Sequence, residues 1–460
     1  MERARRRDAA ILAAIVLAAA LIRAACLRTQ LWLDEIWSLD FALGAKSALG
    51  IFLDIHHYNN HPLNTLWLYF VSGSGDWAVF RMFSFVCGLL TVAALGVEPE
   101  DRPRGLLTAA LAALSVPLIL YSTEARGYAS MALCAVLCRL LLRGPRSLAP
   151  RRAAAFALCA TLGLFSQALF ACVLAALLVW AVAKLPREGL ARALLPLFGP
   201  PAVLFGLYAA HQAGRELGLG PARSFSSAAF GALAQWAGAP PSGVLAVAGA
   251  AVLSALCAWE LARLRRERSA ELWFYAALFA ATAAAVAAVP FRSERYFFAC
   301  APFALILAAG SLSRLLRGGR APRAAGAALI GLFALGGAVQ VRALATAGRG
   351  HYLEAVQRMG AETPGDVVTV GSDHDFRNRL LLDYYATYLP PSKRLEYVTH
   401  AQIPANPPDW LILHSFNPDP RQAPAGLSFP GGTPAYRLVE VYPHSGLSGF
   451  TWMLYRRRNP

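Results

Sequence analysis

Residues 9–40 read AAILAAIVLAAALIRAACLRTQLWLDEIWSLD, an apolar block (9–27) followed directly by a polar segment. An uninterrupted apolar block of about 20 residues is long enough to cross a bilayer as a helix. Just beyond it, Asp34 and Glu35 stand side by side between Trp32 and Trp37. Carboxylates beside a membrane span are costly unless they are used. The stretch therefore predicts a membrane protein with a functional group at the exit of its first span.

Composition supports a membrane protein throughout the chain. Its 460 residues are 57% hydrophobic and only 15% charged, with a mean hydropathy of +0.45, whereas soluble domains carry about 25% charged residues. All eight cysteines lie in or beside apolar blocks, so we expect buried small hydrophobes and neither disulfides nor a CxxC metal site. The first block follows four arginines, as in a signal peptide, but more spans follow, so an uncleaved helix is expected.

Ten more apolar blocks follow the first. The eleven expected spans cover roughly 9–27, 79–97, 105–121, 127–142, 153–166, 168–184, 193–210, 241–262, 273–290, 296–312 and 324–344. With the N-terminus inside, the short inner loops hold most of the Lys and Arg, as the positive-inside rule requires. The net charge of +16 is thus largely a topology signal, and we expect no nucleic-acid partner. The outer segments are then 28–78, 121–128, 165–168, 211–240, 289–296 and the chain after about residue 345.

Two outer regions have a character of their own. HPLNTLWLYFV (61–71) is too short to span and ends in the breaker SGSGD, so it predicts a re-entrant or interfacial helix within the loop 28–78. Residues 345–460 alternate between strand and helix patterns, with strands at TPGDVVTV, RLEYVTH, DWLILHS, YRLVEVY and FTWMLYR and a helix at FRNRLLLDYYATYL. The expected fold is an all-α membrane bundle (1–344) with a small extracytoplasmic α/β domain (345–460).

Charged and polar side chains gather on the outer face, although the helix centres are nearly free of charge. Carboxylates there offer a general base, arginines offer planar permanent cations that suit phosphate oxygens, and tryptophans offer faces for sugar stacking. Such a set fits displacement of a lipid phosphate: the base takes the acceptor's proton, and the cations stabilise the departing phosphate. The clusters are Asp34, Glu35 and Asp40; His56, His57, Asn59, Asn60 and His61; Tyr121, Glu124, Arg126 and Tyr128; and Arg292 to Tyr296, which Arg81 could join.

These motifs together resemble a known family. LWLDE after the first span, HP opening a short helix, YSTEARGY (121–128) and RSERYFFACAP (292–302) are similar to the GT-C family of polyprenyl-phosphate-dependent glycosyltransferases. The nearest branch contains protein O-mannosyltransferases and the lipid A aminoarabinose transferase. The resemblance covers roughly residues 1–315. It implies a polyprenyl-phosphate-linked sugar donor, an active site on the extracytoplasmic face, and an outer C-terminal region.

The resemblance also assigns roles to individual residues. The family's first-loop acid falls on Asp34, with Glu35 beside it, and its phosphate-side arginine falls on Arg126, preceded by Glu124. The late Arg-Tyr motif falls on Arg295 and Tyr296. The chain departs from the pattern in the loop 211–240, which carries little charge. The predicted site therefore has two groups of residues. Asp34 and Glu35 are the catalytic pair, and the donor-binding residues are Arg126, Arg295, Arg292, His61, Glu124, Tyr128 and Arg81.

Structural roles compete with these assignments. Asp34 could cap a helix, Glu35 could pair with an arginine, Arg126 could pair with Glu124, and His61 could cap the short helix before Pro62. Asp34 and Glu35 could instead bind Mg²⁺ or Mn²⁺, so a divalent cation stays open, whereas zinc on His56, His57 and His61 is disfavoured. The triplet Asp373-His374-Asp375 follows a strand and precedes a helix, which favours capping over metal binding.

The function predicted from the sequence is an inverting glycosyltransferase that moves a monosaccharide to a hydroxyl or amine of a lipid, glycan or protein acceptor. A transporter or lipid flippase is the alternative; it would place ionisable residues near the bilayer midplane and show inverted repeats. A membrane scaffold would leave the polar clusters unexplained. The Ala/Arg-rich composition indicates a bacterium, and hence a multi-pass protein of the cytoplasmic membrane.

Overall fold

The computed structural model describes residues 2–97, 101–143, 149–214, 223–417, 423–427, 436–446 and 448–458. They form two compact units. The helical unit comprises residues 1–27 and 41–341, and the sheet unit comprises residues 28–40 and 342–460. The division falls inside α2 (Leu33–Gly44), so the first outer loop contributes to both units.

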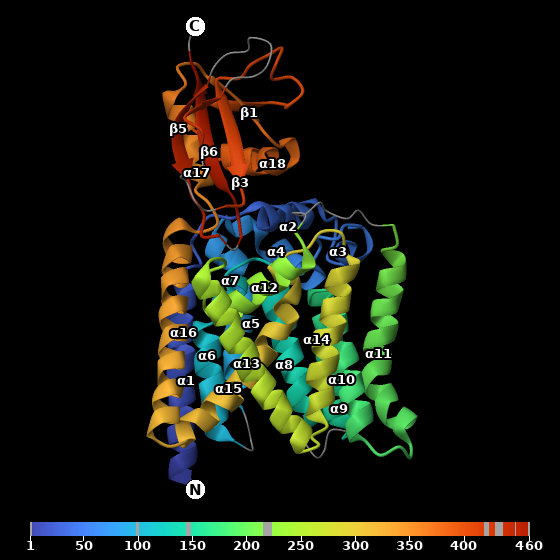
Figure 1. The fold of residues 1–460 in the computed structure, drawn as a ribbon. Coiled ribbons are helices and arrows are strands. Elements are labelled where there is room, and N and C mark those ends of the chain that lie inside the picture. The colour runs from blue at the N-terminus through green and yellow to red at the C-terminus, as the bar shows by residue number, and fades with distance from the viewer. Residues whose placement is uncertain are drawn as a thin grey trace. The chain divides into compact units, whose positions relative to one another are not determined.

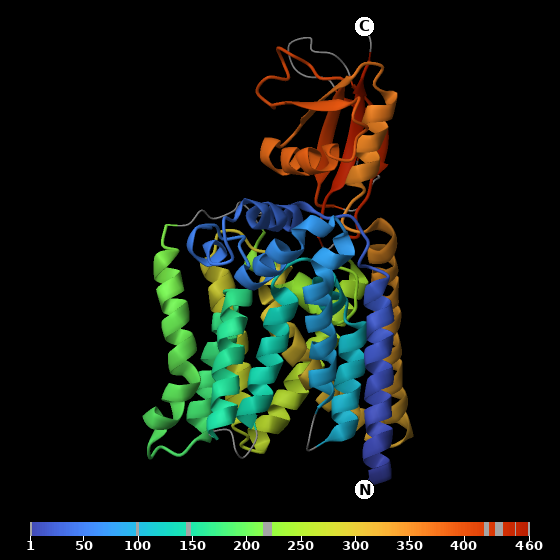
Figure 2. The same cartoon turned by 180° about the vertical axis from the view of Figure 1, so that it is seen from behind.

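Helices make up the helical unit, and a helix lies at each of the eleven positions where the sequence predicts a span. Figures 1 and 2 show the long helices running alongside one another, with α1 at one edge of the unit and α11 at the other. Among the described residues, six helices are long and apolar enough to cross a membrane, or seven if the bent pair α6–α7 is one span. The helices are α1 (Glu2–Ala24), α3 (Gly50–Leu53), α4 (Pro62–Val71), α5 (Trp77–Gly96), α6 (Arg102–Leu114), α7 (Val116–Ser122), α8 (Tyr128–Arg143), α9 (Pro150–Ser166), α10 (Phe170–Lys184), α11 (Leu190–His211), α12 (Phe225–Trp236), α13 (Val244–Arg266), α14 (Glu271–Ala288), the 3₁₀ helix η2 (Glu294–Cys300), α15 (Ala301–Arg317) and α16 (Arg320–Ala347).

Local chemistry explains where several helices begin. The Asp76 carboxylate accepts from the Ala78 N–H at 2.8 Å, and Ser224 Oγ accepts from the Ser227 N–H at 3.1 Å. Each bond satisfies a donor that a helix N-terminus leaves open. Prolines occupy the first turns of α4, α7, α9 and α15, where a missing N–H costs nothing.

A break between α6 and α7 bends the chain by 63° near Ser115 and Pro117. The break frees carbonyls, and the buried Arg23 of α1 satisfies them: its guanidinium donates to the carbonyls of Ala112 and Ala113 at 3.3 and 3.2 Å. Arg23 Nε also donates to Ser122 Oγ at 2.8 Å. One arginine inside the first apolar block therefore holds both sides of the bend.

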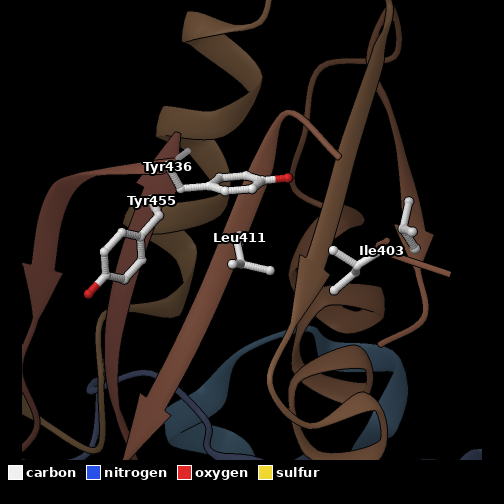
Figure 3. Packing of buried hydrophobic residues seen from close by; sticks show 5 residues of the cluster. Ile403, Leu411, Tyr436 and Tyr455 are labelled. Atoms are coloured by element: carbon white, nitrogen blue, oxygen red, sulfur yellow. The ribbon is translucent and has the colours of Figure 1, made fainter. Parts of the chain in front are cut away.

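A six-stranded mixed sheet forms the core of the sheet unit, in the order β2-β1-β3-β6-β5-β4. β1 pairs in parallel with β2 and β3, whereas β3–β6, β6–β5 and β5–β4 are antiparallel. Figure 3 shows Ile403, Leu411, Tyr436 and Tyr455 packed together in its core. The strand and helix patterns predicted from the sequence all lie on regular elements. These are α17 (Tyr352–Glu362), β1 (Val367–Ser372), α18 (Asp375–Ala386), β2 (Arg394–Val398), β3 (Trp410–Ser415), β4 (Gly426–Leu427), β5 (Tyr436–Tyr442) and β6 (Thr451–Arg457).

The Asp373-His374-Asp375 triplet lies where β1 passes into α18. His374 is the N-cap, and its ring nitrogen accepts from the Arg377 N–H at 3.4 Å. Asp373 accepts from His414 Nδ1 at 2.8 Å and from Asn378 Nδ2 at 3.0 Å. The prediction that this segment caps a helix is confirmed. The capping residue of α18 is His374, at a position where Asp or Ser is more usual.

Candidate functional site

A short turn between α7 and α8 positions Arg126 in the helical unit. Its carbonyl accepts from Ser84 Oγ at 2.9 Å, and its N–H donates to the Glu124 carbonyl at 2.8 Å. The neighbouring Ala125 carbonyl accepts from Asn64 Nδ2 at 2.6 Å. The guanidinium donates to the Asn59 carbonyl at 3.4 Å and is buried. The turn is held from three sides, so the Arg126 side chain has little freedom.

His61 lies against the same turn, at the N-cap of α4. Its ring does not cap the helix; Nδ1 instead contacts the Ser166 carbonyl at 2.9 Å. Gly127 makes this approach possible, because a Cβ there would lie 1.9 Å from the Ser166 carbonyl oxygen and 3.0 Å from His61 Nδ1. Burial lowers the pKa of His61 well below its usual value, and the charges of Arg126 and Arg295 lower it further. His61 is therefore neutral at pH 7.

Aromatic rings surround this histidine. The Tyr128 ring lies 5.4 Å from His61 and 4.6 Å from Tyr121, and Phe298 packs edge-on against Tyr121 at 4.5 Å. Phe298 belongs to η2, the element that carries Arg295. The rings exclude water on one side, which strengthens electrostatic interactions nearby.

Arg295 joins the cluster through Tyr58. Burial raises the pKa of Tyr58, as do the neighbouring hydroxyls of Tyr296 and Tyr128, whereas the positive charge of Arg295 lowers it. A side-chain hydrogen bond links Tyr58 with Tyr296. Segments far apart in the sequence thus bring two arginines, a neutral histidine and several tyrosine hydroxyls together. We call Tyr58, His61, Arg126, Tyr128, Arg295 and Tyr296 the arginine–tyrosine cluster.

Other predicted donor-binding residues have structural contacts. Arg292 donates to the carbonyls of Val286 and Ala287, at 3.2 and 2.9 Å, and so caps the end of α14. Arg81 is fully buried and donates to the Leu27 carbonyl at 2.7 Å. Glu124 is buried on the same turn as Arg126. His56 contacts the Leu53 carbonyl at 3.0 Å, and His57 Nδ1 accepts from the Asn59 N–H at 2.9 Å.

Asp34 and Glu35 belong to the sheet unit, in the first turn of α2. Glu35 Oε2 accepts from the Trp32 N–H at 3.3 Å, the return bond of a capping box. The same oxygen lies 4.0 Å from Arg349 Nε, and both side chains are fully buried. Arg349 in turn donates to Thr29 Oγ1 at 3.0 Å. Glu35 therefore anchors the loop by pairing with an arginine, which is the structural role that the sequence left open.

Asp34 acts electrostatically on a second network of the same unit. Burial lowers the pKa of Arg377, while the carboxylates of Asp373 and Asp34 oppose that change. Arg377 lies 3.2 Å from His414 Nε2, and the other nitrogen of that ring contacts Asp373. Asp34 is thus electrostatically coupled to a cation of the C-terminal region.

The donor set fits a divalent cation poorly. Among the described residues, no three His, Cys, Asp or Glu side chains come together as metal ligands. The Glu35 carboxylate is engaged by a backbone N–H and by Arg349, which leaves it unsuited to a metal that prefers several free oxygens.

Sequence reasoning missed Arg23, Arg349 and Arg377. Arg23 had a signal, since an arginine within an apolar block usually has a partner. Arg349 and Arg377 had none, because their partners lie in the first loop and only folding brings these segments together. Part of the loop 211–240, with Arg215 and Glu216, lies outside the described residues.

The fold is similar to that of solved membrane transferases. ArnT from Cupriavidus metallidurans matches with a TM-score of 0.56 at 14% identity, over 98% of each chain. The Archaeoglobus fulgidus oligosaccharyltransferase matches at 0.52 and 12% identity; it covers 81% of this chain, which spans only 64% of that protein. AglB from A. fulgidus, in complex with an inhibitory peptide and a dolichol-phosphate, matches at 0.50 and 12% identity, over 87% of this chain and 69% of that one. No protein-family model matches the sequence, and a search of curated proteins finds no match. The chain therefore has the GT-C fold that its motifs resemble.

Proposed function

We propose that this protein is an inverting glycosyltransferase that moves a monosaccharide from a polyprenyl-phosphate carrier to an acceptor hydroxyl or amine. The observation that carries the proposal is the arginine–tyrosine cluster, in a chain with the fold of membrane transferases. The fold alone does not give the chemistry. The cluster supports this chemistry, because the buried Arg126 and the partly buried Arg295 lie beside aromatic rings, and arginines suit the oxygens of a phosphate ester.

The phosphate of the donor is held by Arg126 and Arg295 in this proposal. Both charges are permanent, so they stabilise the phosphate equally at any pH near 7. Neutral His61 and the tyrosine hydroxyls add hydrogen bonds without adding charge. Negative charge on the phosphate grows as its bond to the sugar breaks, and preorganised cations lower the energy of that transition state.

Asp34 is the general base in the proposal, and Glu35 is a positioning residue. The acceptor's proton passes to the Asp34 carboxylate while the acceptor O or N forms a bond to the anomeric carbon. The bond from that carbon to the phosphate oxygen breaks, and the polyprenyl phosphate departs with the electron pair. A single in-line displacement inverts the anomeric centre. No step requires a metal.

The carrier's isoprenoid tail needs an apolar surface. A cavity of about 440 Å³ lies among α13, α15 and α16, and nearly all the residues that line it are apolar, chiefly Leu, Ala, Val and Gly. α15 continues directly from η2, which carries Arg295. We assign the tail to this cavity. The acceptor is a lipid, glycan or protein on the outer side of a bacterial cytoplasmic membrane.

The test uses purified full-length protein in lipid nanodiscs, incubated with a panel of polyprenyl-phosphate sugars. Mass spectrometry should detect release of polyprenyl phosphate and transfer or hydrolysis of the sugar. Arg126→Ala and Arg295→Ala should each lower the rate of release about 10²-fold, whereas Arg266→Ala, which removes an exposed arginine of α13, should not change it. Translocation of intact carrier without cleavage would instead support a flippase.

A further inference from the structure

A second polar region of the helical unit is a charged cavity that the proposed reaction does not use. It has a volume of about 630 Å³. Its walls come from the end of α13, the start of α14 and the end of α15. η2 joins α15 at the opposite end of that helix, so the cavity and Arg295 lie toward opposite ends of one continuous segment. The side chains that line it include Asp101, Arg104, Arg143, Trp180, Lys184, Arg263, Glu267, Glu271, Arg314 and Arg317.

Ion pairs build the walls of this cavity. Glu260 is fully buried and lies 3.3 Å from Arg104 and 2.8 Å from Arg263, and it also pairs with Arg314. Gly310 makes room for that carboxylate, because a Cβ there would lie 2.6 Å from it. A second carboxylate, Glu271, pairs with Arg143 at 3.0 Å and with Arg139 at 3.4 Å, and Asp101 pairs with Arg317 at 2.5 Å. The site is therefore preorganised by buried contacts.

Positive charge remains in excess after these pairs are formed. Among the residues that the structure describes, seven basic side chains stand against four acidic ones. The basic side chains are Arg104, Arg139, Arg143, Lys184, Arg263, Arg314 and Arg317, and the acidic ones are Asp101, Glu260, Glu267 and Glu271. Such an excess around a partly enclosed space attracts anions.

Membrane topology does not explain this arrangement. The positive-inside rule concerns the number of Lys and Arg in inner loops and does not require that they be buried, whereas the side chains of Arg139, Arg104 and Arg143 are only 3%, 12% and 15% exposed. Burying cations is costly unless something compensates for lost hydration. The Nε of Arg104 is shielded from solvent and has no hydrogen-bond partner among the described residues.

We propose that this cavity binds a phosphate group, carried either by an anionic phospholipid or by a soluble phosphate compound. Arginine forks match phosphate oxygens, and several of them converge here. Basic pockets between membrane helices on the cytoplasmic side are suited to anionic headgroups. Trp180 and Leu264 add an apolar edge to the cavity. The site is independent of the proposed sugar transfer.

The test measures thermal unfolding and native mass spectra of the full chain in a neutral detergent. The probes are phosphatidylglycerol, inorganic pyrophosphate and, as a neutral reference, phosphatidylcholine. We expect phosphatidylglycerol, pyrophosphate or both to raise the Tm above the reference. A rise with phosphatidylglycerol alone identifies a lipid site, and a rise with pyrophosphate alone or with both identifies a site for phosphate itself.

Variants locate the binding. Lys184→Gln and Arg317→Gln should each lower the affinity for the probe that raises the Tm about tenfold. This is the usual effect of losing one charge-assisted hydrogen bond. Lys184→Arg keeps the charge and should retain binding, which separates loss of the site from loss of folding. Arg266→Gln removes an exposed arginine that does not line the cavity and should bind as wild type. The proposal is overturned if no probe exceeds phosphatidylcholine, or if Lys184→Gln and Arg317→Gln bind as tightly as Arg266→Gln.

Discussion

The first outer loop divides into two parts that belong to different bodies. Residues 28–40 carry Asp34 and Glu35 and pack with the C-terminal region, where Tyr385 donates to the Leu31 carbonyl at 2.6 Å and Trp37 packs on Phe376. Residues 41–78 carry the histidines and pack among the membrane helices. The acids and the phosphate-side cations of the sequence motif therefore come from different structural units.

The C-terminal region therefore shares one compact unit with the acidic pair of the first outer loop. Its Arg349 fixes Glu35, and its Arg377 is coupled to Asp34. The helical unit contributes a different chemistry, with permanent cations and neutral hydrogen-bonding groups around His61. Each of the following experiments perturbs one of the two units.

The largest effect is expected for Asp34→Asn. Loss of the general base should lower kcat about 10³-fold, within the usual range for such catalysis, while donor binding by the helical unit is unchanged. Asp40→Asn is the matched control, because it removes a carboxylate from the same helix at a position with no role in the proposed mechanism. Sugar transfer by Asp34→Asn at the wild-type rate would remove Asp34 from the mechanism.

Glu35→Gln should destabilise the sheet unit by about 3 kcal/mol, because it leaves the buried Arg349 without its carboxylate. Hydrogen exchange of peptides from residues 342–460 would report the loss, and peptides of α9 and α10 should not change. Glu354→Gln removes a half-buried carboxylate from the same unit and should cost much less. Equal protection in the two variants would contradict a special role for the Glu35–Arg349 pair.

Arg126→Ala should lower the rate of donor cleavage about 10²-fold, a loss typical of removing one transition-state contact. Arg126→Lys should recover only part of it, since lysine cannot form the planar fork. Arg292→Ala serves as the comparison, because that side chain binds the carbonyls at the end of α14. If both alanine variants lose the same activity, the phosphate contact is not confined to the arginine–tyrosine cluster.

The smallest effect is expected from protonation of His444, which should lower the stability of the sheet unit alone. Burial lowers its pKa to about 4, and its Nδ1 contacts Thr451 Oγ1 at 2.9 Å. The unfolded chain takes up the proton near pH 6.5, so stability is full above that pH and falls as the pH drops toward 4. Between pH 6.5 and 5 the unit should lose about 1.5 kcal/mol. Chemical denaturation at several pH values measures this, and His444→Gln should flatten the profile.

The sequence predicted the helices and strands well, because apolar blocks and alternating strand patterns are local properties of the chain. The break at α6–α7 follows from Pro117, yet the arginine that satisfies it comes from α1, far away in the chain. Among the predicted site residues, Arg126 and Arg295 lie close enough to His61 for their charges to lower its pKa. Arg292 and Arg81 were harder to interpret, since their backbone contacts depend on helix ends that no pattern marks.

The order of apolar blocks, the charge of the loops and the strand periods by themselves determined a helical membrane unit followed by a small mixed sheet. Hydrophobic burial acts on each segment separately, which is why these features can be read from residue types alone. Only the tertiary structure decided that Glu35 pairs with Arg349, that Asp34 is coupled to Arg377, and that the first loop is shared between two units. Those contacts join segments at opposite ends of the chain, and their energy depends on distance and burial that no linear pattern encodes.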